Sequence, residues 1–311
     1  MVKHEDPKPG EIRLLQKIAR RAGVPKGAGL VLGIGDDCAI FRPRGAPEDL
    51  LFTTDMLIED VHFRRDTHRP EDVGWKALAR GLSDIAAMGG KPRFCLLSLA
   101  VADWAGPRWV EGFYRGLLRL AAREKTALMG GDLARAPQLM CDIVVCGAVP
   151  RGKALRRDGA RAGDAVYVSG RLGGSAAGLA GRGGAARRRH LRPQPRIALG
   201  QFLRTDLRAT AAMDLSDGLS IDLQRLCLAS RLSAQIAAPP AFPGATLDQA
   251  LHGGEDYELL FTVRPRTRVP AQYQGLPLTR IGTMRKGPAG LVELGDSPLA
   301  PLGFDHFRNR S

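Results

Sequence analysis

The alternation of short apolar runs with longer helical patterns, repeated along the whole chain, most constrains the possible fold. Residues 30–34 and 94–101 form apolar runs of strand length, whereas residues 75–86 place apolar side chains three or four positions apart, as on one helix face. The second half repeats this mixture, with a strand pattern at 165–168 and a helical pattern at 218–229. Further strands are expected at 50–52, 127–129, 139–149 and 257–263, and further helices at 11–22, from 107 and from about 196. The pattern predicts an α/β protein with mixed sheets.

A change of composition at Pro150 divides this pattern into two parts. Residues 151–163 are polar and contain glycine, and a new strand pattern begins directly after them. Because strands and helices occur on both sides, each part can form a domain of ordinary size. We therefore expect one α/β domain at residues 1–150 and a second at residues 151–311.

The chain is strongly basic, with 46 Lys and Arg against 32 Asp and Glu and a formal net charge of +14. Such a charge suits an anionic partner, which could be nucleic acid, a membrane or a phosphorylated metabolite. The basic run at 187–189 has no interleaved aromatic residues that could stack on bases. We expect this run to be a solvated loop, and we expect no nucleic-acid or membrane partner.

The N-terminus and the cysteines predict a cytoplasmic protein. The first ten residues carry charges and two prolines instead of the apolar core of a signal peptide. No apolar run approaches the roughly 20 residues of a membrane helix. The five cysteines are odd in number, form no C-x-x-C pair and lie mostly in apolar runs, so buried reduced thiols are expected.

Carboxylates follow apolar runs at five places, each time after small residues or a short polar step. The five segments are 33–37, 53–55, 130–132, 214–218 and 253–256. Glycine lets backbone amides approach a ligand closely, and ionised Asp supplies the oxygen ligands that suit Mg²⁺ beside phosphate. One such segment alone is more often turn or helix-cap chemistry, but five together favour a metal and phosphate site. We expect Asp37, Asp55 and Asp132 beyond the carboxyl ends of strands, where open α/β sheets bind ligands.

One further acid is a candidate site residue, and the absence of several motifs argues against other kinds of site. Asp84 lies among apolar residues near the end of a predicted helix, where a cation partner and solvent exposure are both open interpretations. Neither Lys91 nor Lys153 is followed by the hydroxyl residue of a phosphate-binding P-loop, and Cys38 breaks the dinucleotide fingerprint. Ala177 stands where a nucleophile elbow requires glycine. The six histidines form no metal pair, so zinc is not expected.

Seven motifs occur in order along nearly the whole chain. They are GIGDDCAI at 33–40, TTDMLIEDVHF at 53–63, WKALARGLSDIAAMG at 75–89, MGGD at 129–132, DLSDGLSIDL at 214–223, GGEDYELLFT at 253–262 and GFDHF at 303–307. Together they closely resemble the thiamine-monophosphate kinase family of the PurM-like superfamily. Several are shared with the wider superfamily, whereas TTD with a downstream His-Phe, GGEDYEL and GFDHF are together specific to the kinase family.

This resemblance implies a two-domain PurM-like enzyme, a homodimer through its N-terminal domains, that uses ATP to phosphorylate thiamine phosphate to thiamine diphosphate. By the matching motifs, several Mg²⁺ ions would be held by Asp37, Thr53 or Thr54, Asp55, Asp84, Asp132, Asp214 and Asp217. ATP would be contacted by Tyr114, Gly131, Asp132, Arg157 and Ser216. Thiamine phosphate would be contacted by His62, Glu255 and Phe304.

Some of these residues also have ordinary structural interpretations. Tyr114 lies on the apolar stripe of its helix and could be a core residue, and His62 could be a half-buried strand residue. Glu255 could only mark the start of a strand. Arg156 competes with Arg157 as the residue that contacts phosphate.

Two positions depart from the family pattern. Leu133 and Ala134 replace the usual Thr-Thr after Gly-Gly-Asp, which removes two hydroxyl groups near the phosphates. Phe304 stands where Tyr or Trp is common, which keeps a stacking surface and loses a polar group. Neither change removes a carboxylate.

The implied acceptor is a phosphate monoester whose second pKa is about 6, so it needs no general base at neutral pH. Repulsion between the anionic substrates is the expected difficulty, and metal ions and Arg157 can reduce it. We expect direct in-line transfer without a phosphoenzyme. The alternatives are another ATP-using PurM-like enzyme, such as selenophosphate synthetase or a purine-pathway cyclo-ligase, and an Arg-rich nucleic-acid-binding protein, whose binding would be sensitive to salt.

Overall fold

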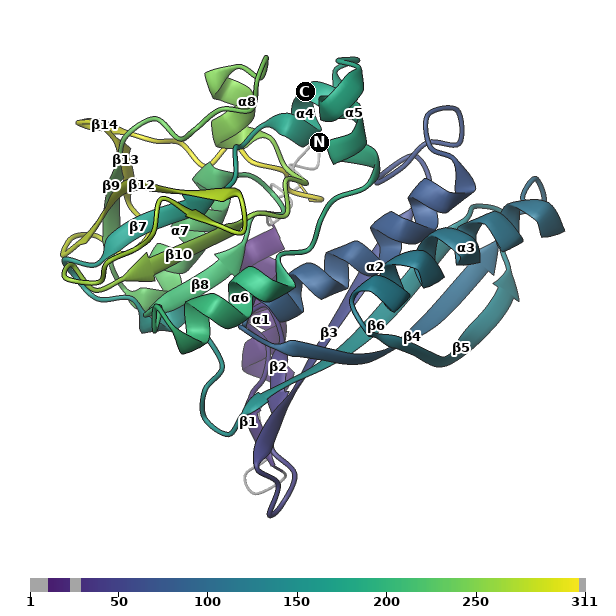
Figure 1. Ribbon diagram of the computed structural model, residues 1–311, viewed down its shortest axis with the longest axis horizontal. Coiled ribbons are helices and arrows are strands. Elements are labelled where there is room, and N and C mark those ends of the chain that lie inside the picture. Colours follow the sequence, from purple (N-terminus) through teal and green to yellow (C-terminus); the bar gives the residue numbers. More distant parts are fainter. Residues whose placement is uncertain (1–10, 23–28, 308–311) are drawn as a thin grey trace, which may run out of the picture.

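The computed structural model describes residues 11–22 and 29–307, which form two mixed β-sheets with helices packed on them (Figure 1). The first sheet has the strand order β1-β2-β3-β6-β4-β5. Its strands are β1 (Leu30–Leu32), β2 (Ala39–Phe41), β3 (Glu48–Ile58), β4 (Lys91–Val101), β5 (Ala127–Arg135) and β6 (Met140–Pro150). Neighbouring strands are antiparallel except β4 and β5, which run parallel.

Two long helices, α2 (Pro70–Ala87) and α3 (Pro107–Arg123), lie across one face of this sheet (Figure 1). Each begins with a proline, which needs no hydrogen-bond acceptor in the first turn of a helix. Ile85 and Phe113 are fully buried in the core beneath them. The helices touch closely at Gly74, where an added Cβ would lie 1.9 Å from the carbonyl oxygen of Phe113. This contact fixes α2, which carries part of the site described below.

The opposite face of the first sheet, here called the outer face, carries no helix in the described part of the chain (Figure 1). Residues in register on neighbouring strands share a face of the sheet. The outward rows are Phe52 with Cys146 and Phe94, Thr54 with Val144 and Leu96, and Met56 with Asp142 and Ser98. Met56 is 49% exposed and Leu96 is 38% exposed. The outer face is therefore largely apolar and open.

The second sheet has the order β14-β13-β9-β12-β7-β10-β8, and β11 pairs with β12. Its strands are β7 (Ala165–Ser169), β8 (Ala211–Asp214), β9 (Ser233–Ile236), β10 (Leu259–Val263), β11 (Gln272–Tyr273), β12 (Leu276–Arg285), β13 (Val292–Leu294) and β14 (Ser297–Pro298). Strands β13 and β9 are parallel, and the other neighbours are antiparallel. Both sheets are therefore mixed, and the expected α/β class with mixed sheets is confirmed.

Six further helices and one 3₁₀ turn complete the described structure. They are α1 (Glu11–Ala22), the 3₁₀ turn Arg157–Gly159, α4 (Gly174–Leu179), α5 (Gly184–Leu191), α6 (Ile197–Thr205), α7 (Leu219–Ser230) and α8 (Leu247–His252). Helix α6 packs on α2 at Gly200, where a Cβ would lie 1.9 Å from the carbonyl oxygen of Ala86. One cluster of buried apolar side chains includes both Leu82 of α2, in the first half of the chain, and Phe261 of β10, in the second half. Because this core is continuous, the division at 150/151 stays a prediction.

The structure corrects three local expectations. Strands β3 and β5 are longer than predicted, so Asp55 and Asp132 lie inside strands and not beyond their carboxyl ends. Asp37, by contrast, follows the carboxyl end of β1 and precedes β2, as predicted. Asp132 is tolerated inside β5 because its side chain is exposed, whereas Asp55 faces α2 and is tolerated because Arg80 forms an ion pair with it. The run at 187–189 lies in α5 and not in a loop, and Arg189 forms an ion pair with the buried Glu258.

Two other expectations concern the cysteines and the N-terminus. All five cysteines are free and buried, as predicted. The expectation for the first ten residues lies outside the described residues. Within residues 11–22 and 29–307, no helix combines the length and the apolar character needed to cross a membrane.

Candidate active site

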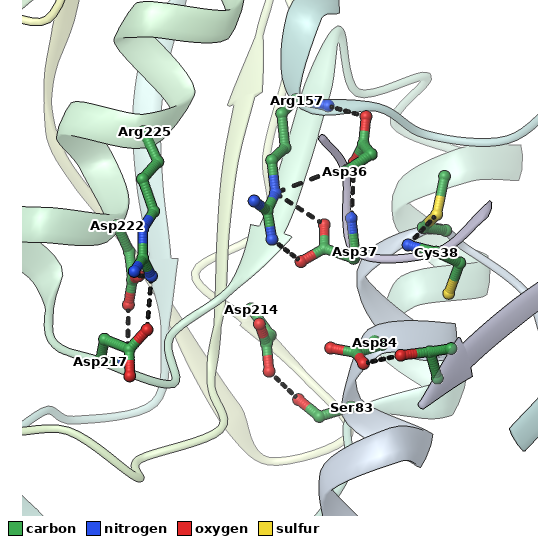
Figure 2. A network of polar contacts seen from close by, with 12 residues as sticks. Asp36, Asp37, Cys38, Ser83, Asp84, Arg157, Asp214, Asp217, Asp222 and Arg225 are labelled. Carbon is green, nitrogen blue, oxygen red and sulfur yellow. Dashed lines mark hydrogen bonds and ion pairs between the residues drawn. The ribbon is translucent and has the colours of Figure 1, made fainter. Parts of the chain in front are cut away.

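Three carboxylates from distant segments of the chain converge between the two sheets. Asp37, Asp84 and Asp214 each place one oxygen within 4.8 Å of the others (Figure 2). Asp37 precedes β2, Asp84 lies in the last turn of α2, and Asp214 is the last residue of β8. Hard carboxylate oxygens in such a group are the ligands that Mg²⁺ prefers. We call these three residues the acid trio.

Burial and mutual repulsion give the acid trio unusual electrostatics. Burial raises the pKa of both Asp84 and Asp214 well above the usual range, and neighbouring carboxylates raise them further. The Thr53 hydroxyl donates a hydrogen bond to Asp84 at 2.5 Å, and the Ser83 hydroxyl donates one to Asp214 at 2.7 Å. A bound cation would favour the ionised forms of these acids. The residues present therefore fit a divalent metal ion.

Arg157 borders the acid trio from the second half of the chain (Figure 2). Its guanidinium donates to both oxygens of Asp37, at 2.6 and 3.3 Å, and its backbone N–H donates to Asp36 at 3.1 Å. Burial opposes the charge of Arg157, but Asp37 and Asp36 outweigh it and raise its pKa. Burial and then Asp37 raise the pKa of Asp36 to about 7. Arg156 pairs instead with Asp158, so the geometry favours Arg157 over Arg156.

The side chains of the Thr-Thr-Asp segment in β3 alternate between the two faces of the sheet, because successive side chains of a strand point to opposite sides. Thr53 faces α2 and reaches Asp84. Asp55 lies on the same side, and its charge contributes to the raised pKa of Asp84. Thr54 faces outward, and its hydroxyl donates to Asp142 at 2.7 Å. Thr53 and Asp55 therefore border the acid trio, and the side chain of Thr54 does not.

Two expected metal ligands lie outside the acid trio. Asp132 is exposed on β5 and is in register with Ser98, which is in turn in register with Asp142 on the outer face. Asp217 forms an ion pair with Arg225, at a distance from the acid trio (Figure 2). These two acids therefore do not form one cluster with the acid trio. The reason for Asp132 is that β6 and β4 separate β5 from β3.

The expected ATP contacts also divide into two groups. Tyr114, Gly131 and Asp132 line one open hollow of about 620 Å³ along the edge strand β5. Gly131 is required there, because a Cβ would lie 1.8 Å from the carbonyl oxygen of Leu97. The aromatic ring of Tyr114 also packs against the core, so its structural interpretation holds as well. Arg157 and Ser216 lie outside this hollow, because Arg157 contacts Asp37 and Ser216 lines another cavity with Asp217.

The three expected contacts of thiamine phosphate lie together. His62, Glu255 and Phe304 line a cavity of about 140 Å³ with Ser216 and Asp217, and we call it the front cavity. The backbone N–H of Phe304 donates to the carbonyl oxygen of Asp217 at 2.9 Å. This hydrogen bond holds the GFDHF segment at 303–307 against the loop that contains Asp217. The front cavity therefore joins residues from three distant motifs.

A buried lysine fixes the position and charge of Glu255. The Nζ atom of Lys76 lies 2.7 Å from Oε1 of Glu255 and donates to the backbone carbonyl of His62 at 3.0 Å. Nδ1 of His190 lies 3.3 Å from Oε2 of the same carboxylate. Burial alone would raise the pKa of Glu255, but Lys76 and His190 outweigh it and hold the pKa well below its usual range. Glu255 is thus a permanent carboxylate, and not merely the start of a strand.

Sequence reasoning missed several residues that shape this site. Arg80 donates to Asp55 at 3.0 Å from α2, and Ser83 and Lys76 belong to the same helix. The spacing of Lys76, Arg80 and Asp84 was the available signal, because residues four positions apart share a helix face, whereas Ser83 had no such signal. Asp142 was also missed, although a charged residue inside an otherwise apolar strand is itself a signal.

Comparisons with known proteins identify the family. The family model for the N-terminal domain of AIR synthase related proteins matches residues 35–149. The thiamine-monophosphate kinase of Escherichia coli (strain K12) is 42% identical over 306 residues, covering 89% of this chain and 92% of that relative. This chain belongs to the thiamine-monophosphate kinase family.

Solved structures agree with this family. AaThiL complexed with AMPPCP and TMP has a TM-score of 0.85 and 34% identity, covering 96% of this chain and 97% of that chain. The thiamine-monophosphate kinase from Stenotrophomonas maltophilia K279a has a TM-score of 0.76 and 38% identity, covering 93% and 98%. The resemblance that the seven motifs indicated is confirmed over most of the chain.

Proposed function

We propose that this chain transfers the γ-phosphoryl group of ATP directly to the phosphate of thiamine monophosphate and so forms thiamine diphosphate. Membership of the thiamine-monophosphate kinase family supports the activity and its ATP dependence. The observation that carries the mechanism is the convergence of Asp37, Asp84 and Asp214 beside Arg157. Acids and a guanidinium at one place match the needs of a reaction between two polyanions.

The acid trio would hold Mg²⁺, with Thr53 and Asp55 beside it. Asp217 at the front cavity and Asp132 at the β5 hollow would hold further ions, and Thr54 could do so only through its backbone. When bound, Mg²⁺ neutralises charge on the phosphate oxygens. The raised pKa values of Asp84 and Asp214 support this proposal, because a cation offsets the burial and the neighbouring negative charges that raise them.

The remaining residues bind and orient the two substrates. Arg157 stabilises the charge that develops on the transferred group, and no side chain acts as general base because the acceptor oxygen is already ionised. Tyr114, Gly131, Asp132 and Ser216 contact ATP. His62, Glu255 and Phe304 hold thiamine monophosphate in the front cavity, where Phe304 offers an aromatic face to the cationic thiazolium.

We also propose a homodimer formed through the outer face, with residues 1–150 as the dimerising domain. Met56 and Leu96 support this assembly, because they are exposed apolar side chains on a sheet face that no helix covers within residues 11–22 and 29–307. The β5 hollow with Asp132 lies at the edge of the same sheet. A partner on this face would shield side chains that are otherwise in contact with water.

The direct test is ADP release from ATP and Mg²⁺ with three acceptors: thiamine monophosphate, unphosphorylated thiamine and an aminoimidazole ribonucleotide. We expect turnover with thiamine monophosphate alone. Turnover with aminoimidazole ribonucleotide alone would contradict the proposed acceptor. Direct transfer is tested separately with γ-labelled ATP and no acceptor, because a covalent phosphate on the protein would refute it.

A further inference from the structure

One hollow in the second half of the chain has no role in the chemistry described so far. It has a volume of about 620 Å³ and shares no lining residue with the front cavity or with the β5 hollow. Three arginines from separate segments line it: Arg161 after the 3₁₀ turn, Arg208 between α6 and β8, and Arg264 directly after β10. We call it the basic hollow. The fold thus brings together three positive charges that are far apart along the sequence.

These positive charges are not neutralised by acids nearby. In the part of the chain that the structure describes, the guanidinium groups of Arg161, Arg208 and Arg264 form no hydrogen bond and no ion pair. Asp206 is the one acid among the described residues that line the hollow. The buried Asp164 accepts a hydrogen bond from the backbone N–H of Arg161 at 2.9 Å, but it forms no ion pair with that guanidinium. The basic hollow therefore keeps an excess of positive charge.

The backbone around the basic hollow is held in place by packing. Leu207 and Ala209, on either side of Arg208, are only 7% and 9% exposed. Between them, Arg208 has a φ of 50°, in the left-handed region that is unfavourable for a residue with a Cβ. Gly159 packs against the next residue of this segment, because an added Cβ would lie 1.9 Å from the carbonyl oxygen of Thr210. Little ordering of the backbone therefore remains to be done when a ligand binds.

The residues that line the hollow indicate a compact anion. A guanidinium can donate two parallel hydrogen bonds to one phosphate group, and this geometry makes arginine a common phosphate ligand. No aromatic residue is among the described residues that line the hollow, so they offer no stacking surface to a nucleotide base or to a thiazolium ring. Three guanidinium groups around one hollow suit a ligand with more than one phosphate group. The lining thus fits an inorganic polyphosphate better than a nucleotide or a second copy of a substrate.

We propose that the basic hollow is a binding site for a compact inorganic phosphoanion, of which diphosphate is the simplest with two phosphate groups, and that Arg161, Arg208 and Arg264 hold it. The site is separate from the acid trio and does not depend on the proposed function. It also gives a role to part of the excess of Lys and Arg over Asp and Glu, which the acidic candidate active site does not explain.

The test is a calorimetric titration of the full chain with diphosphate in the presence of EDTA, which keeps Mg²⁺ from carrying diphosphate to the acid trio. We expect saturable binding to the wild type. Arg208→Gln and Arg264→Gln should each weaken it at least about tenfold, as the loss of one charge-assisted hydrogen bond predicts. Arg108→Gln is the matched control, because Arg108 is exposed on α3 in the first half of the chain and does not line the hollow. The control should change the affinity by less than about twofold at physiological ionic strength, where distant charges are screened.

Three results of this titration would overturn the proposal. They are no binding to the wild type at millimolar diphosphate, unchanged affinity in both Arg208→Gln and Arg264→Gln, and an equal loss in Arg108→Gln, which would show only general attraction to a basic protein. Should either variant not fold, Arg161→Gln replaces it in the same comparison.

A short single-stranded RNA is the second probe. RNA binding that requires Arg208 and Arg264, without any binding of diphosphate, would assign the hollow to nucleic acid and also overturn the proposal. These titrations measure binding and not turnover, so the basic hollow and the proposed function fail separately: loss of the kinase activity leaves the expected titration unchanged.

Discussion

Replacing Asp84 by Asn should stabilise the metal-free protein while it removes the activity. Two unit charges 4.8 Å apart repel by about 3.5 kcal/mol at an effective dielectric constant of about 20. Asp84 faces two such charges, from Asp37 and Asp214. Asn keeps an oxygen that can accept the hydrogen bond from Thr53. The substitution therefore removes repulsion without removing that hydrogen bond.

The gain is smaller than the full repulsion, because the acids relieve part of it by taking up protons. A shift of one pKa unit corresponds to about 1.4 kcal/mol. We expect Asp84→Asn to gain about 1–3 kcal/mol at pH 8 without metal, which raises Tm by several degrees. We also expect kcat to fall at least about 100-fold, because a ligand charge is lost.

The sign of the pH dependence follows from the raised pKa values. In the folded state, Asp84 and Asp214 bind protons more tightly than in the unfolded state. The metal-free wild type should therefore become more stable as pH falls from 8 toward 6, where Asp36 with its pKa of about 7 also takes up a proton. This gain should be smaller in Asp84→Asn.

Thermal unfolding with EDTA or Mg²⁺ measures these effects. Mg²⁺ should raise the Tm of the wild type, since a ligand at 100 times its Kd adds about 2.7 kcal/mol, and should have little effect on Asp84→Asn. Asp103→Asn is the matched control, because that side chain is 84% exposed and should change neither Tm nor activity. A lower metal-free Tm for Asp84→Asn, or an intact Mg²⁺ response, would refute the reasoning.

Three further predictions concern the front cavity and the outer face. Phe304→Ala should weaken binding of thiamine monophosphate by about 1–2 kcal/mol, the value of a cation–π contact, and an unchanged KM would contradict this role. Lys76→Met should lower stability by about 2–3 kcal/mol in denaturant unfolding, because it leaves the carboxylate of Glu255, which is only 24% exposed, without its buried partner. Adding Glu255→Gln should recover most of that loss; no recovery would show that the ion pair is not the cause. Leu96→Arg should give monomers in sedimentation velocity, and an unchanged dimer mass would exclude the outer face as the interface.

The sequence identified the acids that form the candidate site. It did not predict the position of every one of them in the fold. Asp37, Asp84 and Asp214 were all named from motifs, and the fold brings them together. Asp132 was also named, but its position depends on strand order and register, which small residues such as glycine specify weakly. The bulge in β4–β5 pairing next to Gly130 is such a case.

Other residues could not be predicted because their importance arises only from tertiary contacts. Lys76 lies in an apolar helix stripe, where a lysine normally extends to the surface. Its complete burial depends on Glu255, which is 179 positions away along the sequence.

The continuous core explains how the protein can hold repelling charges together. Asp84 and Asp214 come from opposite halves, yet Ser83 bonds directly to Asp214 and α6 packs against α2 at Gly200. These contacts belong to buried elements and not to loops, so the repulsion within the acid trio is opposed by packing that cannot yield locally. The distance between Asp84 and Asp214 is therefore set before any cation arrives, and Asp37, in the β1–β2 connection, is held by Arg157. A pair fixed in this way favours Mg²⁺ binding, because less ordering of the ligands remains to be done on binding.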